Sequence, residues 1–161
     1  MISKQAARDA FSKAARNYDA SAVLQREIGG RMLERLDYIR LQPKMILDAG
    51  AGTGEASAAL MKRYPRSRVV ALDFALPMLK RARRRGRWLR RPLPLCADAE
   101  HLPLADASCD LVFSSLTLQW CNDLPITLQG LLGALKPGGL LMFTTFGPDT
   151  LKELRACWRQ L

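Results

Sequence analysis

The chain has 161 residues, of which 48% are hydrophobic and 25% charged, a composition typical of one globular domain of ordinary core size. No apolar run reaches the ~20 residues that cross a bilayer, and residues 1–18 are too polar for a secretion signal, so we expect a cytoplasmic protein. The four cysteines form no CxxC pair and there is a single histidine, which argues against structural zinc and favours reduced thiols.

The formal net charge of +10 is concentrated in one segment. Residues 80–91 read KRARRRGRWLRR and carry eight basic residues and no acid, so the rest of the chain sums to +2. Arginines near the end of a helix complement its dipole, which explains much of this run without a partner. RNA or an acidic protein would be attracted to it. We expect the run to lie away from the ligand-binding edge, and we do not expect nucleic acid as the partner.

Residues 3–40 have helical spacing. Apolar residues recur at intervals of three and four, first in Phe11, Ala14, Ala15 and Tyr18, and then in Leu24, Ile28, Met32 or Leu33, and Leu36. Ser21 is the expected cap between two such helices. We therefore predict an N-terminal helical lid, residues 1–42, ahead of a core formed by residues 43–161.

After residue 43 the pattern changes to alternating strands and helices. The predicted strands are Met45–Ala49, Arg68–Leu72, Leu93–Ala97, Asp110–Ser115 and Leu140–Phe146. The predicted helices are Glu55–Tyr64, Pro77–Arg85, Leu124–Leu135 and Thr150–Gln160, with a turn at residues 136–139 (KPGG). Apolar strands that alternate with helices of this length predict an α/β fold, a parallel sheet with helices on both faces.

The first strand runs into a glycine-rich turn, residues 46–54 (ILDAGAGTG), and the second is followed by Asp73. Glycines let a backbone approach a ligand closely, and an acid at the next strand end can accept hydrogen bonds from both hydroxyls of a ribose. The alternative is a tight strand-to-helix turn without a ligand. In parallel sheets ligands bind at the carboxyl ends of the strands, so Asp98 and residues 114–116, which follow the third and fourth strands, should join the same edge.

The glycine-rich turn does not favour a phosphate. If G-x-G-x-x-G is counted from Gly50, the last glycine position holds Glu55, which would repel a phosphate, and no lysine follows the turn as in a P-loop. Acids at Asp48 and Glu55 suit a ligand that is cationic near the loop. S-adenosylmethionine fits, since it carries an ammonium and a sulfonium and has no phosphate.

These motifs resemble those of the class I S-adenosylmethionine-dependent methyltransferases. The resemblance covers nearly all of residues 43–147 and rests on residues 48–54 (DAGAGTG), Asp73, residues 97–99 (ADA) and residues 136–139 (KPGG). A closer resemblance is to the malonyl-[acyl-carrier protein] O-methyltransferases of biotin synthesis. Three segments carry it: residues 11–19 (FSKAARNYD), 115–121 (SLTLQWC) and 145–155 (TFGPDTLKELR).

The resemblance implies a Rossmann-like, mostly parallel sheet in the strand order 3-2-1-4-5, the first part of a seven-stranded fold. This chain ends at Leu161, so we expect it to lack the last two strands. The strand at residues 140–146 would then be an uncovered apolar edge, a feature that proteins generally avoid, and we expect self-association or poor solubility.

The resemblance also implies individual roles. Twelve residues would contact the cofactor: Tyr18, Gln25, Asp48, Gly50, Ala51, Gly52, Asp73, Phe74, Met78, Asp98, Ala99 and Ser114. Among them Asp73 would bind the ribose hydroxyls, while Asp98 and the Ala99 N–H would contact adenine. Trp120 would border the substrate pocket. His101 is expected to pack near the adenine rather than to act as a base.

The implied reaction is transfer of the sulfonium methyl group to the free carboxylate of a malonyl thioester on acyl-carrier protein. A carboxylate is already ionised at neutral pH, so no catalytic base is assigned; alignment and exclusion of water remain as the enzyme's contribution. An acidic carrier protein is expected to dock on the leading helices, at Lys4, Arg8, Lys13 and Arg16.

Other functions stay open. Methyltransferases that act on base amino groups usually have an Asn/Asp-Pro-Pro-aromatic stretch after the fourth strand, where this chain has SSLT at residues 114–117. Related respiratory-complex assembly factors, including an arginine hydroxylase, retain much of the same cofactor region. A methyltransferase acting on another small molecule or on RNA is a further alternative.

Overall fold

The computed structural model describes residues 2–86, 89–147, 149–150 and 152–158. Its strands form one sheet in the order β3-β2-β1-β4-β5, and every neighbouring pair is parallel. The strands are β1 (Met45–Ala49), β2 (Arg68–Asp73), β3 (Leu93–Cys96), β4 (Cys109–Ser115) and β5 (Leu135–Thr144). The predicted fold class and strand order are therefore confirmed.

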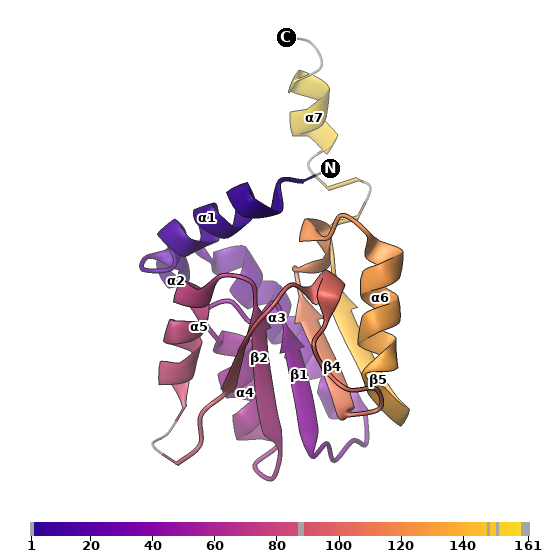
Figure 1. The fold of residues 1–161 in the computed structure, drawn as a ribbon. Coiled ribbons are helices and arrows are strands. Elements are labelled where there is room, and N and C mark those ends of the chain that lie inside the picture. Colours follow the sequence, from indigo (N-terminus) through magenta and orange to yellow (C-terminus); the bar gives the residue numbers. More distant parts are fainter. Residues whose placement is uncertain (1, 87–88, 148, 151, 159–161) are drawn as a thin grey trace.

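Helices cover both faces of this sheet. They are α1 (Lys4–Ala14), α2 (Tyr18–Ser21), α3 (Val23–Arg35), α4 (Glu55–Arg63), α5 (Leu76–Ala82), α6 (Leu124–Gly133) and α7 (Lys152–Trp158). Short 3₁₀ turns are η1 (Leu36–Tyr38), η2 (Arg83–Arg85), η3 (Ala99–His101) and η4 (Leu118–Trp120). In Figure 1, α3 and α4 lie behind the sheet, α6 lies in front, and α1 and α2 cross above the carboxyl ends of the strands.

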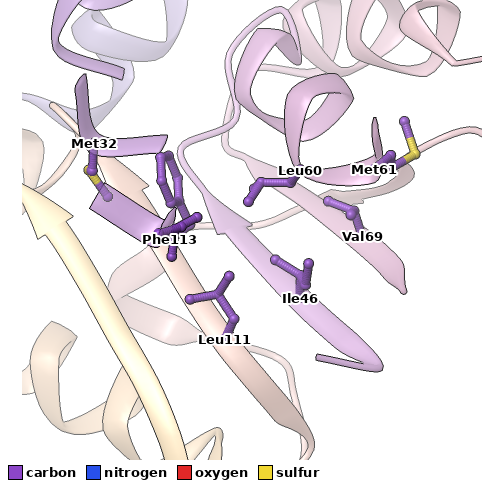
Figure 2. Packing of buried hydrophobic residues seen from close by; sticks show 8 residues of the cluster. Met32, Ile46, Leu60, Met61, Val69, Leu111 and Phe113 are labelled. Carbon is purple, nitrogen blue, oxygen red and sulfur yellow. The ribbon is translucent and has the colours of Figure 1, made fainter. Parts of the chain in front are cut away.

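The core consists of two layers because successive strand residues point to opposite faces. Figure 2 shows the face toward α3 and α4, with Met32, Ile46, Leu60, Met61, Val69, Leu111 and Phe113. On the other face, Leu47 and Val112 pack with Leu131 of α6. Both faces of β1 and β4 are covered, which explains the unbroken apolar runs at residues 45–47 and 111–113. Burial of each such side chain contributes roughly 1.5–3 kcal/mol to folding.

The sequence had suggested that the KPGG segment, residues 136–139, forms a turn ahead of β5. In the structure this segment is part of β5. The pairing of β5 with β4 shifts from Cys109↔Leu135 to Leu111↔Leu140, so residues 136–139 form a bulge between two paired stretches. Gly138 has φ +78°, which a glycine adopts without steric strain. The strand therefore begins five residues earlier than predicted, at Leu135 instead of residue 140.

In the leading helices, the N-cap residue and the buried face differ from those predicted. Ser21 ends α2, and its Oγ donates to the carbonyl of Tyr18 (3.1 Å), while the N-cap of α3 is Ala22 without a side-chain hydrogen bond. Ser21 is therefore not the cap that the sequence had suggested, because its hydroxyl is bonded back into the preceding turn. Leu24 is 51% exposed despite its helical spacing, since α3 turns Met32 rather than Leu24 toward the sheet.

The helices of the predicted N-terminal lid have two different positions. Met32 of α3 and Leu36 of η1 belong to the sheet's core. Phe11 of α1 and Tyr18 of α2 instead line a cavity above the sheet. We therefore use "lid" for α1 and α2, residues 4–21, alone. None of the helices in the described part of the chain is long and apolar enough to cross a membrane.

The outer edge of β5 leads to a testable expectation. Among the described strands β5 pairs only with β4, and Phe143 is 41% exposed. An edge of this kind can pair with another chain, so the 161-residue chain should self-associate with increasing concentration. Light scattering should show this, and Phe143→Lys should shift the chain toward monomer. Leu89→Lys, which adds the same charge beside the opposite edge strand, is the control; a wild-type monomer at every concentration would refute the expectation.

Candidate cofactor site

A cavity of about 360 Å³ is lined by residues of the lid and by residues at the carboxyl ends of the strands. Ten of the predicted site residues line it: Tyr18, Gln25, Asp48, Gly50, Ala51, Gly52, Asp73, Phe74, Met78 and Trp120. They come from the lid, α3, the ends of β1 and β2, α5 and η4. The structure thus brings together most of the residues that the sequence had placed at one edge of the sheet.

The glycine-rich loop is shaped by close approaches of other segments. Gly50 has φ +80°, and a Cβ there would lie 1.9 Å from Thr117 Oγ1. Gly54 has φ +82°, and a Cβ there would lie 2.6 Å from the Cβ of Ala82 in α5. These two glycines therefore admit the loop after β4 and the end of α5, respectively. The amides of Gly50 and Ala51 both donate to the carbonyl of Leu72 (2.8 Å each), which ties the loop to β2.

Asp73 holds the loop and also faces the cavity. Its Oδ2 accepts the N–H of Gly52 (2.9 Å) and its Oδ1 accepts the N–H of Ala75 (2.8 Å). Burial raises the pKa of Asp73, although these two amide donors oppose the shift. Each carboxylate oxygen has a second lone pair, so Asp73 can still accept hydrogen bonds from a ligand's hydroxyl groups.

Asp48 is the second buried carboxyl group of the cavity, with 2% of its surface exposed. Ser57 Oγ of α4 donates to Asp48 Oδ2 (2.5 Å). Burial, with a smaller contribution from the charge of Asp73, raises the pKa of Asp48 to about 7 against the opposing hydrogen bond from Ser57. A cationic ligand would favour the ionised form of this group.

Asp98 and Ala99 do not join the other ten residues in the lining of the cavity. Asp98 caps η3, and its Oδ1 accepts both the N–H of Glu100 (3.1 Å) and Lys4 Nζ of the lid (3.0 Å). Lys4 Nζ also lies 2.7 Å from Glu100 Oε2. Although partial burial lowers it, the pKa of Lys4 is raised by Glu100 and Asp98. This lysine is thus occupied within the chain, unlike the free docking residue that we expected.

Ser114 is corrected as a cavity residue. It is fully buried, and its Oγ donates to the carbonyl of Ala49 (2.9 Å), which links β4 to β1. The side chains after it, residues 115–117, line the cavity instead. Consecutive strand residues point in opposite directions, so Ser114 faces β1 while the residues after it reach the cavity. His101 is exposed on η3 and is not part of the lining.

Several cavity residues were not assigned to the site from the sequence, and Phe11 and Gln119 are two of them. The Phe11 ring packs edge-on against Trp120 (5.1 Å between centroids) and Phe74 (5.8 Å). Its spacing of two helical turns from Tyr18 is a signal that could have indicated its place. Gln119 Nε2 donates to the carbonyl of Leu116 (2.6 Å), while its buried Oε1 has no partner among the described residues. No local pattern distinguishes this glutamine.

We had expected the basic run, residues 80–91, to lie away from the ligand-binding edge, but one end of it reaches that edge. Arg85 of η2 reaches the glycine-rich loop, where its Nε donates to the carbonyl of Thr53 (2.8 Å). The physical reason is the close packing of Gly54 on Ala82, which brings the end of α5 against the loop. Arg90, at the other end of the run, donates to the carbonyl of Met61 (3.0 Å) and so caps α4.

Comparison with known proteins agrees with this geometry. A family model described as "Methyltransferase domain" matches residues 47–143. This range begins within β1 and contains the glycine-rich loop and both buried carboxyl groups, Asp48 and Asp73. The chain belongs to this methyltransferase family. The matched residues of the methyltransferase domain do not include the lid, which lies ahead of them.

Relatives of this methyltransferase-domain chain extend the similarity to the lid. The malonyl-[acyl-carrier protein] O-methyltransferase of Gallionella capsiferriformans (strain ES-2) is 54% identical over 165 residues, covering 99% of this chain and 57% of the relative. The protein of the same name from Methylovorus sp. (strain MP688) is 52% identical over 166 residues, covering 99% and 56%. The chain therefore spans just over half the length of these curated relatives.

A solved structure supports the fold of this methyltransferase domain. A methyltransferase in complex with the Haloferax volcanii Trm112 methyltransferase activator superposes with a TM-score of 0.76. The two chains are 22% identical, and the match covers 93% of this chain and 74% of the other. At this identity the likeness concerns the fold alone.

Proposed function

We propose that this chain is the S-adenosylmethionine-binding part of a cytoplasmic O-methyltransferase that methylates the free carboxylate of malonyl-[acyl-carrier protein] in biotin precursor synthesis. The observation that carries the proposal is the pair of buried carboxyl groups, Asp48 and Asp73, beside a glycine-rich loop in one cavity. The names of relatives that match 99% of the chain support the choice of acceptor.

The residues present fit this cofactor. The cavity of about 360 Å³ lies within the usual range for small-molecule sites. Gly52 lies beneath the ring of Tyr18, where a Cβ would make an ordinary contact 4.0 Å from Tyr18 Cε1. Asp48 would face the cationic methionine end, and Asp73 the ribose hydroxyls. We further propose that the N-terminal segment, residues 1–42, acts as the cover of a core formed by residues 43–161.

One carboxylate oxygen of Asp98 is free to contact the adenine end of the cofactor. Both contacts of Asp98, with Lys4 and with the amide of Glu100, use Oδ1. Among the described residues no hydrogen bond reaches Oδ2, which remains able to accept from an adenine amino group. We therefore retain Asp98 and Ala99 as proposed adenine contacts.

When bound, S-adenosylmethionine supplies a methyl group on a positively charged sulfur. With the cofactor held by Asp48 and Asp73, the acceptor carboxylate would take the methyl group in one displacement, and the electron pair of the broken carbon–sulfur bond would remain on sulfur. No proton is transferred, because the acceptor is ionised at neutral pH. The chain's part is to align the reactants and to exclude water with Phe11, Tyr18 and Trp120, which line the cavity.

The proposal predicts two measurable results. The chain should bind S-adenosylmethionine in calorimetry, and malonyl-[acyl-carrier protein] incubated with both should gain one methyl group by mass spectrometry. Acetyl-[acyl-carrier protein] is the matched control, since it has the same thioester but no free carboxylate. Absence of cofactor binding would refute the proposed site. Binding with equal methylation of both carrier proteins would refute the proposed acceptor.

A further inference from the structure

Two arginines of the basic run converge on one carboxylate of the lid. Asp19 Oδ2 lies 2.7 Å from Arg85 Nη2 and 3.2 Å from Arg81 Nη2. These residues are more than 60 positions apart in the chain. Asp19 also directly follows Tyr18, whose ring lies over the glycine-rich loop. The lid is thus ionically connected to α5 and η2 at the point where it covers the cavity.

The same group is bonded to the glycine-rich loop itself. Thr53 Oγ1 donates to Asp19 Oδ1 (2.5 Å), and Arg85 Nε donates to the carbonyl of Thr53 (2.8 Å). Arg26 Nη2 donates to the backbone carbonyl of Asp19 (2.6 Å). Arg85 therefore contacts the lid and the loop at once, which a solvated arginine at a helix end would not do.

We propose that Arg81 and Arg85 are positioning residues of the cofactor site, which act through Asp19 to fasten the lid to the glycine-rich loop and hold Tyr18 over the cavity. The cluster of Asp19, Thr53, Arg81 and Arg85 is called the latch. The latch concerns the ligand-free chain, and its effect on cofactor retention rests on the proposed function.

The latch has the properties of a contact that opens. Arg85 and Asp19 side chains are 30% and 31% exposed, and those of Arg81 and Asp19 are 40% and 31% exposed, so water and salt reach both ion pairs. Partly exposed pairs are weak and screened by salt, which allows the lid to open for ligand exchange. Partial burial acts to raise the pKa of Asp19. The hydrogen bond from Thr53 and the charges of Arg85 and Arg81 outweigh burial and hold this pKa below its usual value. The latch therefore remains charged at neutral pH.

Hydrogen exchange of the ligand-free chain tests the latch without any cofactor. Arg85→Ala should raise the exchange of lid amides, residues 4–21, about three- to fivefold, the range for loss of a partly exposed ion pair. Arg84→Ala is the matched control, because Arg84 lies in the same 3₁₀ turn and its side chain makes no hydrogen bond or ion pair with the described residues. Equal lid exchange in the Arg85→Ala and Arg84→Ala chains would overturn the proposal.

A double-mutant cycle separates the latch from a general loss of structure. Asp19→Asn and Arg85→Ala should each speed lid exchange, and the double variant should be no faster than Asp19→Asn alone, because Asp19→Asn also removes the Arg81 ion pair. High salt should speed lid exchange more in the wild-type chain than in Arg85→Ala, which keeps only the Arg81 ion pair, with Arg85→Lys intermediate. Additive effects of the two substitutions, or the same salt response in wild type and Arg85→Ala, would show that Arg85 does not act through Asp19.

Cofactor retention is measured on the same variants. Dissociation of S-adenosylhomocysteine should be about three- to fivefold faster from Arg85→Ala than from Arg84→Ala, in line with the lid exchange. Normal dissociation from Arg85→Ala despite faster lid exchange would overturn the role of the latch in cofactor retention. If the wild-type chain binds no S-adenosylhomocysteine, the proposed function fails, while the exchange experiments still decide whether the latch holds the lid.

Discussion

Asp73→Ala should weaken binding of S-adenosylmethionine by at least about 100-fold, because two hydrogen bonds to a charged group are lost, each worth ~1.5–3 kcal/mol. The substitution also frees the amides of Gly52 and Ala75, which the carboxylate now holds at 2.9 and 2.8 Å. The glycine-rich loop should therefore loosen at the same time. Titration calorimetry of the variant gives the affinity, and thermal unfolding by circular dichroism shows whether the chain remains folded.

Asp110→Ala is the matched control for this substitution. Asp110 Oδ2 also accepts two backbone amides, those of Lys44 and Met45 (2.8 Å each), but at the opposite edge of the sheet. Loss of Asp110 should lower the unfolding temperature and leave cofactor affinity nearly unchanged. Binding by Asp73→Ala within about threefold of wild type would exclude the proposed contact with the ribose, since that difference is below 1 kcal/mol.

Cofactor affinity should rise with pH, and Asp48 should be the reason. The pKa of Asp48 in the ligand-free chain is about 7, so below this value a proton must leave before the carboxylate can pair with a cationic ligand. From about pH 8 to about pH 6 the affinity should therefore fall nearly tenfold. Asp48→Asn should bind more weakly at high pH and show almost no change over this range. Calorimetry in buffers of different ionisation enthalpy would also detect the released proton.

The same substitution has the opposite effect on the stability of the ligand-free chain. Because the folded pKa of Asp48 is raised from 3.8 to about 7, its cost to folding is absent below the unfolded value and complete above the folded value. That cost is up to about 4 kcal/mol for a shift of this size. Asp48→Asn should thus raise the unfolding temperature at about pH 8 and much less at about pH 5.

The comparison of variant with wild type is the relevant readout for this prediction. Asp19, Glu100 and Asp110 have lowered pKa values, so they stabilise the folded chain more as pH rises and oppose the effect of Asp48. Subtracting the wild-type profile removes their contributions. A stability difference between Asp48→Asn and wild type that stays constant from acid to alkaline pH would contradict the assignment of the raised pKa to Asp48.

Local sequence patterns by themselves determined the sheet and most of the cavity. Apolar strand segments buried on both faces, such as β1 and β4, and glycines with positive φ at positions 50, 52 and 54 are properties of neighbouring residues. Once the strands are parallel, their carboxyl ends meet at one edge, which brings Asp48 and Asp73 together. Most assignments that depended on this logic line the cavity, whereas Asp98 and Ser114, assigned in the same way, do not.

The tertiary structure alone decided which distant side chains pair with each other. Lys4 meets Asp98 across 94 positions of sequence, and Asp19 meets Arg85 across 66. No local period encodes such contacts, because they depend on where the lid lies over the sheet. The direction of Ser114 and the bulge at residues 136–139 likewise depend on the pairing of β4 with its neighbours. Chain-local chemistry therefore determined the binding edge, whereas packing between distant segments determined how that edge is covered.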